Sequence, residues 1–129
     1  KIKQVSFPTE HFVAGAEKIP LKDNSVDCVV STWNLCTIPS PEIALKEIFR
    51  VLKPNGKFIF IEHGKSDKVF PARLQKIITP ISKHFTGGCH LYRNIETLII
   101  QTGFTIEKLK KFRSKPLLFM YKGTAIARK

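Results

Sequence analysis

Apolar and polar positions alternate along the chain in a pattern that predicts strand, helix and strand in succession. Residues 26–31 and 57–62 are β-branched or aromatic and almost continuously apolar, which is typical of strands buried on both faces of a parallel sheet. Between them, apolar residues recur at helical spacing after Ser40-Pro41-Glu42, a helix start with a capping hydroxyl, a proline and an acid. The turn Pro54-Asn55-Gly56 should end that helix. The pattern predicts a right-handed βαβ unit.

Further elements are expected on both sides of this unit. The short apolar stretch 11–14 stops at a glycine and predicts the end of a strand. A helix is expected over 94–103, with an asparagine cap at its start and a glycine at its end. Two strands near 104–112 and 121–128 would close the chain as an antiparallel hairpin at one edge of the sheet.

The segment 70–85 predicts an amphipathic helix, which Pro80 should kink or end near Thr79. Arg73 and Lys76 lie off its apolar face, so the helix fits two interpretations. It could cover the sheet or a substrate pocket, which is the commoner use of such a helix, or lie on a membrane surface. The apolar face is made by Phe70, Leu74, Ile77, Ile78, Ile81 and Phe85.

Composition bounds the class of protein. The 129 residues, 43% hydrophobic and 25% charged, suit one globular domain or a piece of one. The net charge is +12, and the basic residues are concentrated toward the C-terminus. This basic region would attract the phosphate of nucleic acid or of an anionic lipid surface. The alternative is a solvated, lysine-rich face without a partner. Three cysteines without CxxC spacing, and no long apolar run, predict a reduced, cytoplasmic protein, with peripheral membrane contact as a variant.

Two motifs carry a family resemblance. Residues 15–31, Gly-Ala-Glu through Val-Val-Ser, and residues 44–56, Ala-Leu-Lys-Glu through Pro-Asn-Gly, resemble the motifs that follow the glycine-rich loop in class I S-adenosylmethionine-dependent methyltransferases, among them the ubiquinone and menaquinone C-methylases. The resemblance implies a Rossmann-like α/β sheet of strand order 3-2-1-4-5-7-6. Strands ending near Ala14, Ser31 and Glu62 would be the third, fourth and fifth, and the hairpin would be the sixth and seventh.

The first two strands and the glycine-rich turn of that family have no counterpart here. Residues 1–129 are therefore expected to be the C-terminal part of a single methyltransferase domain. The strand at 26–31 would then be an exposed apolar edge, open to self-association, and residues 1–25 would be loosely held.

A second resemblance bears on the acceptor. Glu62-His63, Pro80, Lys83-His84 and the run 88–93 are similar to the later region of the methyltransferase-like thiol methyltransferases, which associate with membranes. This similarity implies methyl transfer to a small, lipophilic or thiol-bearing molecule. The alternatives are a quinone precursor or a phospholipid head group as acceptor, or a basic, non-catalytic module that binds a membrane or, less readily, nucleic acid.

The resemblance also assigns roles to individual residues, with S-adenosyl-L-methionine as the cofactor. His63 or Arg93 could lower the pKa of an acceptor thiol electrostatically. The structural alternatives are an ordinary acidic turn at 15–17, plain packing for Trp33, and polar surface for His63 and His90. No metal site is expected, because Cys89 and His90 with His84 and His63 match no structural zinc spacing. The expected cofactor residues are Gly15, Ala16, Glu17, Ser31, Thr32 and Trp33, the acceptor residues Asn34, Leu35, His90 and Tyr92, and the catalytic residues His63 and Arg93.

Overall fold

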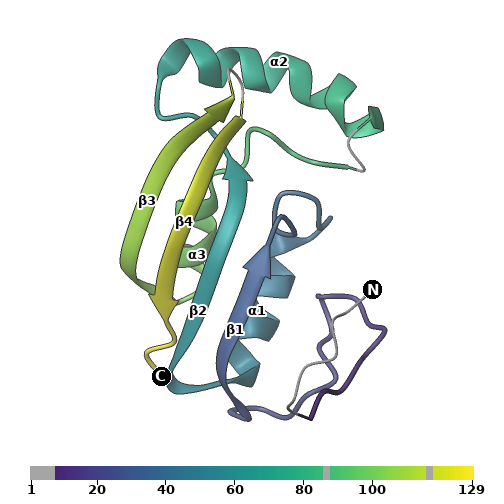
Figure 1. The fold of residues 1–129 in the computed structure, drawn as a ribbon, viewed down its shortest axis with the longest axis vertical. Coiled ribbons are helices and arrows are strands. Elements are labelled where there is room, and N and C mark those ends of the chain that lie inside the picture. Colours follow the sequence, from purple (N-terminus) through teal and green to yellow (C-terminus); the bar gives the residue numbers. More distant parts are fainter. Residues whose placement is uncertain (1–7, 86–87, 116–117) are drawn as a thin grey trace.

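The computed structural model describes residues 8–85, 88–115 and 118–129, leaving out the side chains of Ser82, Lys83, Phe85 and Lys115. Four strands form one sheet, and three helices accompany it (Figure 1). In chain order the elements are β1 (Val26–Thr32), α1 (Pro41–Val51), β2 (Leu52–Gly64), α2 (Val69–Phe85), α3 (Ile95–Gln101), β3 (Thr105–Lys115) and β4 (Leu118–Ile126).

The sheet has the strand order β1-β2-β4-β3. β1 pairs with β2 in parallel, whereas β4 lies antiparallel to both β2 and β3. This order is what strands four, five, seven and six of the expected methyltransferase sheet would give, so the predicted fold class is confirmed. Among the described residues β1 pairs only with β2, which makes it an edge strand, and the Val30 side chain on it is 65% exposed.

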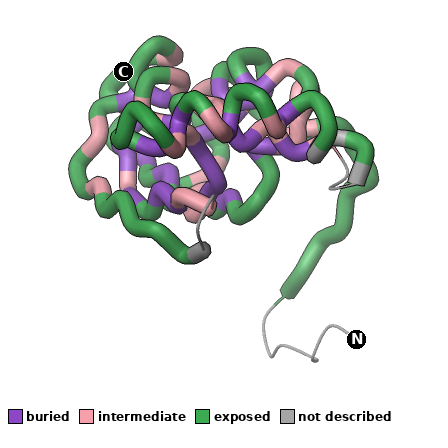
Figure 2. Tube along the Cα trace, turned by 90° about the horizontal axis from the view of Figure 1, so that it is seen from above, coloured by how far each residue is buried: buried purple, intermediate pink, exposed green. Residues whose placement is uncertain are grey.

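The core lies between the sheet and the two helices α1 and α3, which pack on the same face (Figure 1). Phe58 and Phe60 from β2 stack with ring centroids 5.5 Å apart, and both are fully buried. Ile95 and Ile99, one helical turn apart on α3, are fully buried and complete the core on the helical side of the sheet. The buried stretches run through the middle of the molecule in Figure 2, whereas the segment after the N-terminus runs exposed along one side.

The predicted strand at 11–14 is wrong. Residues 8–14 are exposed and form no strand. In the expected sheet order the third strand pairs with neighbours other than β1, and no strand beyond β1 exists among the described residues to accept its hydrogen bonds.

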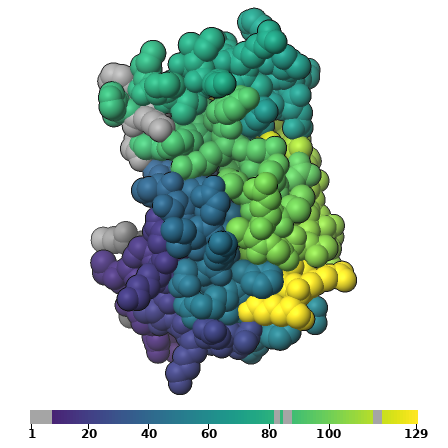
Figure 3. All heavy atoms as spheres, turned by 180° about the vertical axis from the view of Figure 1, so that it is seen from behind, coloured from purple at the N-terminus to yellow at the C-terminus, as the bar shows by residue number. Residues whose placement is uncertain are grey.

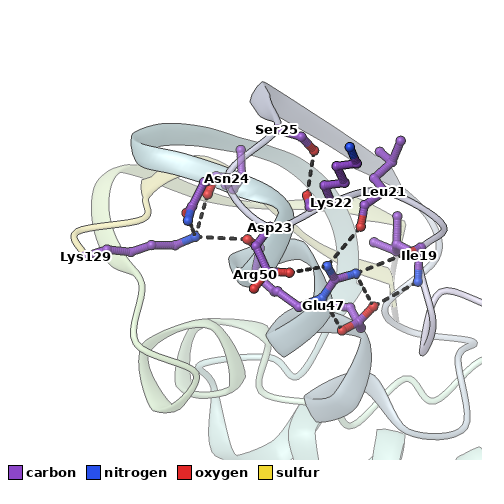
Figure 4. Close-up of polar contacts among 10 residues, drawn as sticks. Ile19, Leu21, Lys22, Asp23, Asn24, Ser25, Glu47, Arg50 and Lys129 are labelled. Atoms are coloured by element: carbon purple, nitrogen blue, oxygen red, sulfur yellow. Dashed lines mark hydrogen bonds and ion pairs between the residues drawn. The ribbon is translucent and has the colours of Figure 1, made fainter.

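The segment leading into β1 is instead held by side chains of α1 (Figure 4). The guanidinium of Arg50 donates to the carbonyls of Ile19 and Leu21 and pairs with Asp23 at 2.6 Å. Glu47 accepts from the Ile19 N–H at 2.9 Å and from Arg50. Residues 19–23 therefore follow the side of α1, and the expectation that residues 1–25 are loosely held fails for this part.

Helix α1 begins and ends close to its predicted bounds, with two local differences. Ser40 is the N-cap, but its side chain makes no capping hydrogen bond. The turn residues 54–56 lie within the bounds of β2, where the pairing with β1 is irregular, rather than between two elements. Asn55 has a φ of 62° there, the left-handed conformation that an asparagine tolerates.

Helix α2 lies across the end of the sheet (Figures 1 and 3) and runs on through Pro80, so it does not end near Thr79, one of the two outcomes predicted for this proline. It buries Ala72, Gln75 and Thr79, whereas Leu74 and Ile78 of the predicted apolar face are half-buried. Gln75 bonds the backbone of Gly64 and Ser66, polar groups that need partners after β2 ends.

The predicted apolar face of α2 is largely open to solvent. Phe70, Ile77 and Ile81 are 78%, 68% and 63% exposed, and the side chain of Phe85 lies outside the described residues. No helix in the described part of the chain has the length and hydropathy required to cross a membrane.

Candidate functional site

The parallel pairing of β1 and β2 brings the carboxyl ends of both strands to one edge of the sheet, where ligands bind in open α/β folds. Ser31 and Thr32 lie beside Phe60 and Ile61. Just beyond, the buried carboxylate of Glu62 accepts hydrogen bonds from Ser31 Oγ at 2.8 Å and from the Asn34 N–H at 3.2 Å. Burial raises the pKa of Glu62 above its ordinary value.

The first cavity lies beside β1 and has a volume of about 390 Å³. It brings together five of the predicted site residues: Gly15, Ala16, Ser31, Asn34 and Leu35. Glu17 follows in the same turn as Ala16 and is partly exposed. The remaining lining is mostly apolar and comprises Phe12, Ala14, Ile19, Pro20, Val29, Val30, Ile38 and Ile48.

The second cavity, of about 350 Å³, opens beyond the ends of β1 and β2. Trp33 and His63 are the predicted site residues on its wall. Its lining is mostly apolar, with two thiols and one imidazole as the main polar groups. The residues are Trp33, Cys36, Thr37, His63, Cys89, Leu91 and Leu118. We refer to it as the cysteine cavity.

Cys36, His63 and Cys89 form a buried cluster at the cysteine cavity, and their ligand atoms all lie within 4.8 Å of one another. Cys89 Sγ is 3.6 Å from His63 Nδ1. Hydrogen bonding by the Cys89 thiol, assisted by His63 and Thr37, lowers the pKa of Cys36 to about 4, while the pKa of Cys89 is raised because its proton is the one held between the two sulfurs. The cluster therefore favours one thiolate, on Cys36, at neutral pH.

The turn at Trp33 lies between the two cavities. Its φ of 60° is unusual for a bulky residue and costs of the order of 1–3 kcal/mol. Its N–H donates to the Ile61 carbonyl at 3.0 Å. The indole, 55% exposed, meets the His63 ring edge-on with centroids 4.1 Å apart. The residues around this turn alternate between the two cavities. Ser31, Asn34, Leu35 and Ile38 line the first cavity, whereas Trp33, Cys36 and Thr37 line the cysteine cavity.

Three predicted residues lie elsewhere. Arg93 donates to the carbonyls of Leu35 and Ile38, both at 2.6 Å, and therefore holds the 35–39 loop. Burial lowers the pKa of Arg93. Tyr92 lines a separate cavity of about 230 Å³ under α2, where Lys65 Nζ lies 4.8 Å from its ring centroid. His90 is half-buried, and its N–H donates to the Cys36 carbonyl. Their predicted roles in catalysis and acceptor binding stay predictions.

Sequence reasoning did not select Glu62, Cys36 or Cys89 for the site. A signal existed for two of them, because Cys36 and Glu62 follow or end strands at the edge where ligands bind. Nothing in the spacing could have paired Cys36 with Cys89, which are 53 positions apart (89 − 36).

Comparison with known proteins agrees with this geometry. A family model described as a methyltransferase domain matches residues 1–60. The chain is 41% identical over 87 residues to the thiol S-methyltransferase TMT1B of Rattus norvegicus, covering 65% of this chain and 36% of that protein. It is 31% identical over 108 residues to the ubiquinone/menaquinone biosynthesis C-methyltransferase UbiE of Brucella canis, covering 80% and 36%. The chain thus spans about a third of the length of these relatives.

A solved structure of a SAM-dependent methyltransferase from Methanosarcina mazei superposes with a TM-score of 0.69 at 22% identity, covering 96% of this chain and 69% of that one. The family model, the relatives and this fold together support a class I methyltransferase. The order of its four strands matches the expected fourth, fifth, seventh and sixth strands of that sheet.

Proposed function

We propose that the protein containing this chain transfers a methyl group from S-adenosylmethionine to a small-molecule thiol. The observation that carries the proposal is the pair of cavities on either side of the Trp33 turn, one suited to the cofactor and the other to an apolar acceptor. When bound, the cofactor supplies an electrophilic methyl group on a sulfonium.

The first cavity suits the adenosine part of the cofactor. Its volume of about 390 Å³ falls in the range of ligand pockets, and a mostly apolar lining with a few polar groups is usual for them. Backbone at Gly15 and Ala16 can meet the polar edge of a purine, while Val29 and Ile19, which line the same cavity, could pack against its faces. Arg50 and Glu47 support this wall by fixing the backbone of Ile19.

The cysteine cavity suits the acceptor. Methyl transfer is an in-line displacement, so donor and acceptor must be held in a fixed orientation away from water. Trp33 lies on the wall of the cysteine cavity, and the next residues, Asn34 and Leu35, lie on the wall of the first cavity, so this turn can set the distance between acceptor and cofactor. Leu91 and Leu118 supply an apolar wall that excludes water.

A thiol acceptor is favoured by the imidazole in this cavity. A thiol reacts as its thiolate, so a group that removes its proton or stabilises its charge raises the rate. His63 is buried, and its Nε2 has no hydrogen-bond partner in the described part of the chain. It can hold the proton that leaves an entering thiol.

The test is a product assay with the full-length protein. The protein is incubated with isotopically labelled S-adenosylmethionine and either a small alkyl thiol or a demethylated quinol, and methylated products are identified by mass spectrometry. We expect label on the thiol sulfur, and a rate at least tenfold lower for His63→Gln. His84→Gln, on the exposed surface of α2, is the matched control and should keep the wild-type rate.

Methylation of the quinol without methylation of the thiol would overturn the proposed acceptor. A protein that binds S-adenosylhomocysteine too weakly to be detected by calorimetry, but is retained on anionic vesicles in a salt-dependent manner, would favour the basic membrane-binding module instead.

A further inference from the structure

The cluster of Cys36, His63 and Cys89 offers more than a hydrogen-bonded group of side chains. The three residues come from separate parts of the chain: the turn after β1, the end of β2, and the segment before α3. All three are buried, at 2%, 7% and 7% exposure. Two sulfurs and one imidazole converging in an apolar pocket form the donor set that zinc prefers, and they match the three-ligand arrangement of catalytic zinc sites, which keep one open position.

The distances agree with such a site. Zinc bonds of about 2.3 Å to sulfur and about 2.0–2.1 Å to nitrogen, at tetrahedral angles, separate the two ligand atoms by about 3.6 Å. In the structure, Cys89 Sγ and His63 Nδ1 lie 3.6 Å apart. The three ligand atoms lie within 4.8 Å of one another, so rotation of the cysteine side chains would complete the set.

The surroundings also favour a bound cation. The imidazole of His63 is more than nine-tenths buried, and its Nδ1 faces the Cys89 sulfur. The neighbouring carboxylate of Glu62 is buried as well, and its Oε2 lacks a partner among the described residues. The guanidinium of Arg93 is engaged with the carbonyls of Leu35 and Ile38. Buried sulfur and nitrogen ligands beside a carboxylate form surroundings in which a cation is favoured.

We propose that Cys36, His63 and Cys89 bind one thiophilic divalent cation, Zn²⁺, with its fourth coordination position open to the cysteine cavity. The sequence pattern predicts no metal site, because the combination of Cys89 and His90 with His84 and His63 matches no zinc spacing. The cluster in the fold shares Cys89 and His63 with that combination and adds Cys36. His84 lies exposed on α2 and outside the cluster.

The open position gives the cation a role in the proposed reaction. With the cation bound, His63 would act as a ligand through Nδ1 and not as the proton acceptor. A thiol that enters the cavity would bind as the fourth ligand and release its proton to bulk solvent at the cavity mouth, since a coordinating thiol is deprotonated by the metal. Its sulfur would then be held at the end of the cavity that adjoins the Trp33 turn. This role rests on the proposed function, whereas cation binding by the three residues does not.

Metal binding can be measured without any activity assay. The untagged protein is fully reduced, desalted without oxygen and titrated with Zn²⁺ against a chromophoric chelator, and separately with Co²⁺. We expect one cation per chain, with the thiolate-to-cobalt charge-transfer band and the visible bands of tetrahedral cobalt. Cys36→Ser, Cys89→Ser and His63→Gln should each weaken binding by roughly tenfold or more.

Cys28→Ser is the matched control, because Cys28 is exposed on β1 and lies outside the cluster. It should bind zinc as the wild type does. Circular dichroism checks that each variant is folded, and the cobalt spectrum of the wild type tests the site without any variant. Reduced wild-type protein with three free thiols that binds no cation would overturn the proposal, as would wild-type affinity in the folded variants Cys36→Ser and Cys89→Ser.

The two proposals fail separately. Zinc binding without methyl transfer to thiols would leave the metal site standing and remove the proposed acceptor. Thiol methylation by a protein that binds no cation would leave the proposed acceptor standing and remove the metal site.

Discussion

Replacing Arg93 by methionine should loosen the loop that carries Cys36. The guanidinium donates two hydrogen bonds of 2.6 Å to the carbonyls of Leu35 and Ile38, and a longer one of 3.5 Å to Pro39. Charged hydrogen bonds contribute about 1.5–3 kcal/mol each, and a buried carbonyl left without a donor costs about 1–3 kcal/mol. The cost of burying the guanidinium, which lowers the pKa of Arg93, offsets part of this. We expect a net loss of about 3 kcal/mol.

Urea denaturation followed by circular dichroism measures this loss, and hydrogen exchange locates it. The amides of Thr37 and Ile38, which donate to the Asn34 carbonyl, should exchange faster in Arg93→Met than in the wild type. Arg73→Met, on the exposed side of α2, keeps the change in charge but should cost less than about 0.5 kcal/mol. Equal stability of both variants, with unchanged exchange in the loop, would refute the role given to Arg93.

Three further predictions concern the residues around the cavities. Burial raises the pKa of Glu62 above its ordinary 4.5, so the folded state is most favoured with this group neutral, and stability is lost as pH rises through the raised pKa. In urea titrations, Glu62→Gln should therefore gain stability relative to the wild type between pH 4 and pH 7. A difference in stability that does not change with pH would contradict this. Gly64→Ala would place a Cβ 2.6 Å from the Tyr121 ring and should cost about 1–3 kcal/mol, whereas Gly15→Ala, whose Cβ meets a flexible carboxylate at 3.3 Å, should change little on thermal melting. Arg50→Met should speed hydrogen exchange in the segment before β1 and weaken binding of S-adenosylhomocysteine; unchanged exchange there would show that the ion pairs seen in Figure 4 do not hold the cavity wall.

The fold was predictable where local patterns coincide with long-range pairing. The continuous apolar run of β1 and the helix start at Ser40 could be placed from the sequence alone, since β-branched runs and proline-acid starts have few other uses. The segment 11–14 was not predictable in the same way. Its residues are apolar enough for a strand, but a strand exists only where a neighbour accepts its hydrogen bonds, and that depends on residues far away in the chain.

The prediction of the buried face of helix α2 failed for a different reason. Its apolar spacing suggests that Phe70, Ile77 and Ile81 face the core, yet those side chains are exposed. The backbone at Gly64 and Ser66, where β2 ends, needs hydrogen bonds, and Gln75 supplies them. The helix is therefore oriented by one amide side chain, a contact that hydrophobic periodicity does not encode.

The site was predictable only as far as strand ends mark it. Ser31 and His63 follow from the rule that ligands bind beyond the carboxyl ends of parallel strands. Cys89 could not be assigned, because it reaches the cluster through the segment before α3, whose path is set by contacts such as the hydrogen bond from the Lys65 N–H to the Arg93 carbonyl. Contacts between segments that are distant in sequence decide which side chains share a cavity.

The Trp33 turn connects these observations. An aromatic residue with a φ of 60° is unfavourable in isolation, so the surroundings must hold it there. Hydrogen bonds to Ile61 and Glu62 on β2 do so from one side, and the carbonyls fixed by Arg93 do so from the other. Since Cys36 follows this turn by three residues, the same bonds that hold the strained backbone also set the position of its sulfur against His63 and Cys89. Strain at Trp33, burial of Glu62 and the geometry of the cysteine cluster are thus parts of one arrangement, and a change in any of them should move the others.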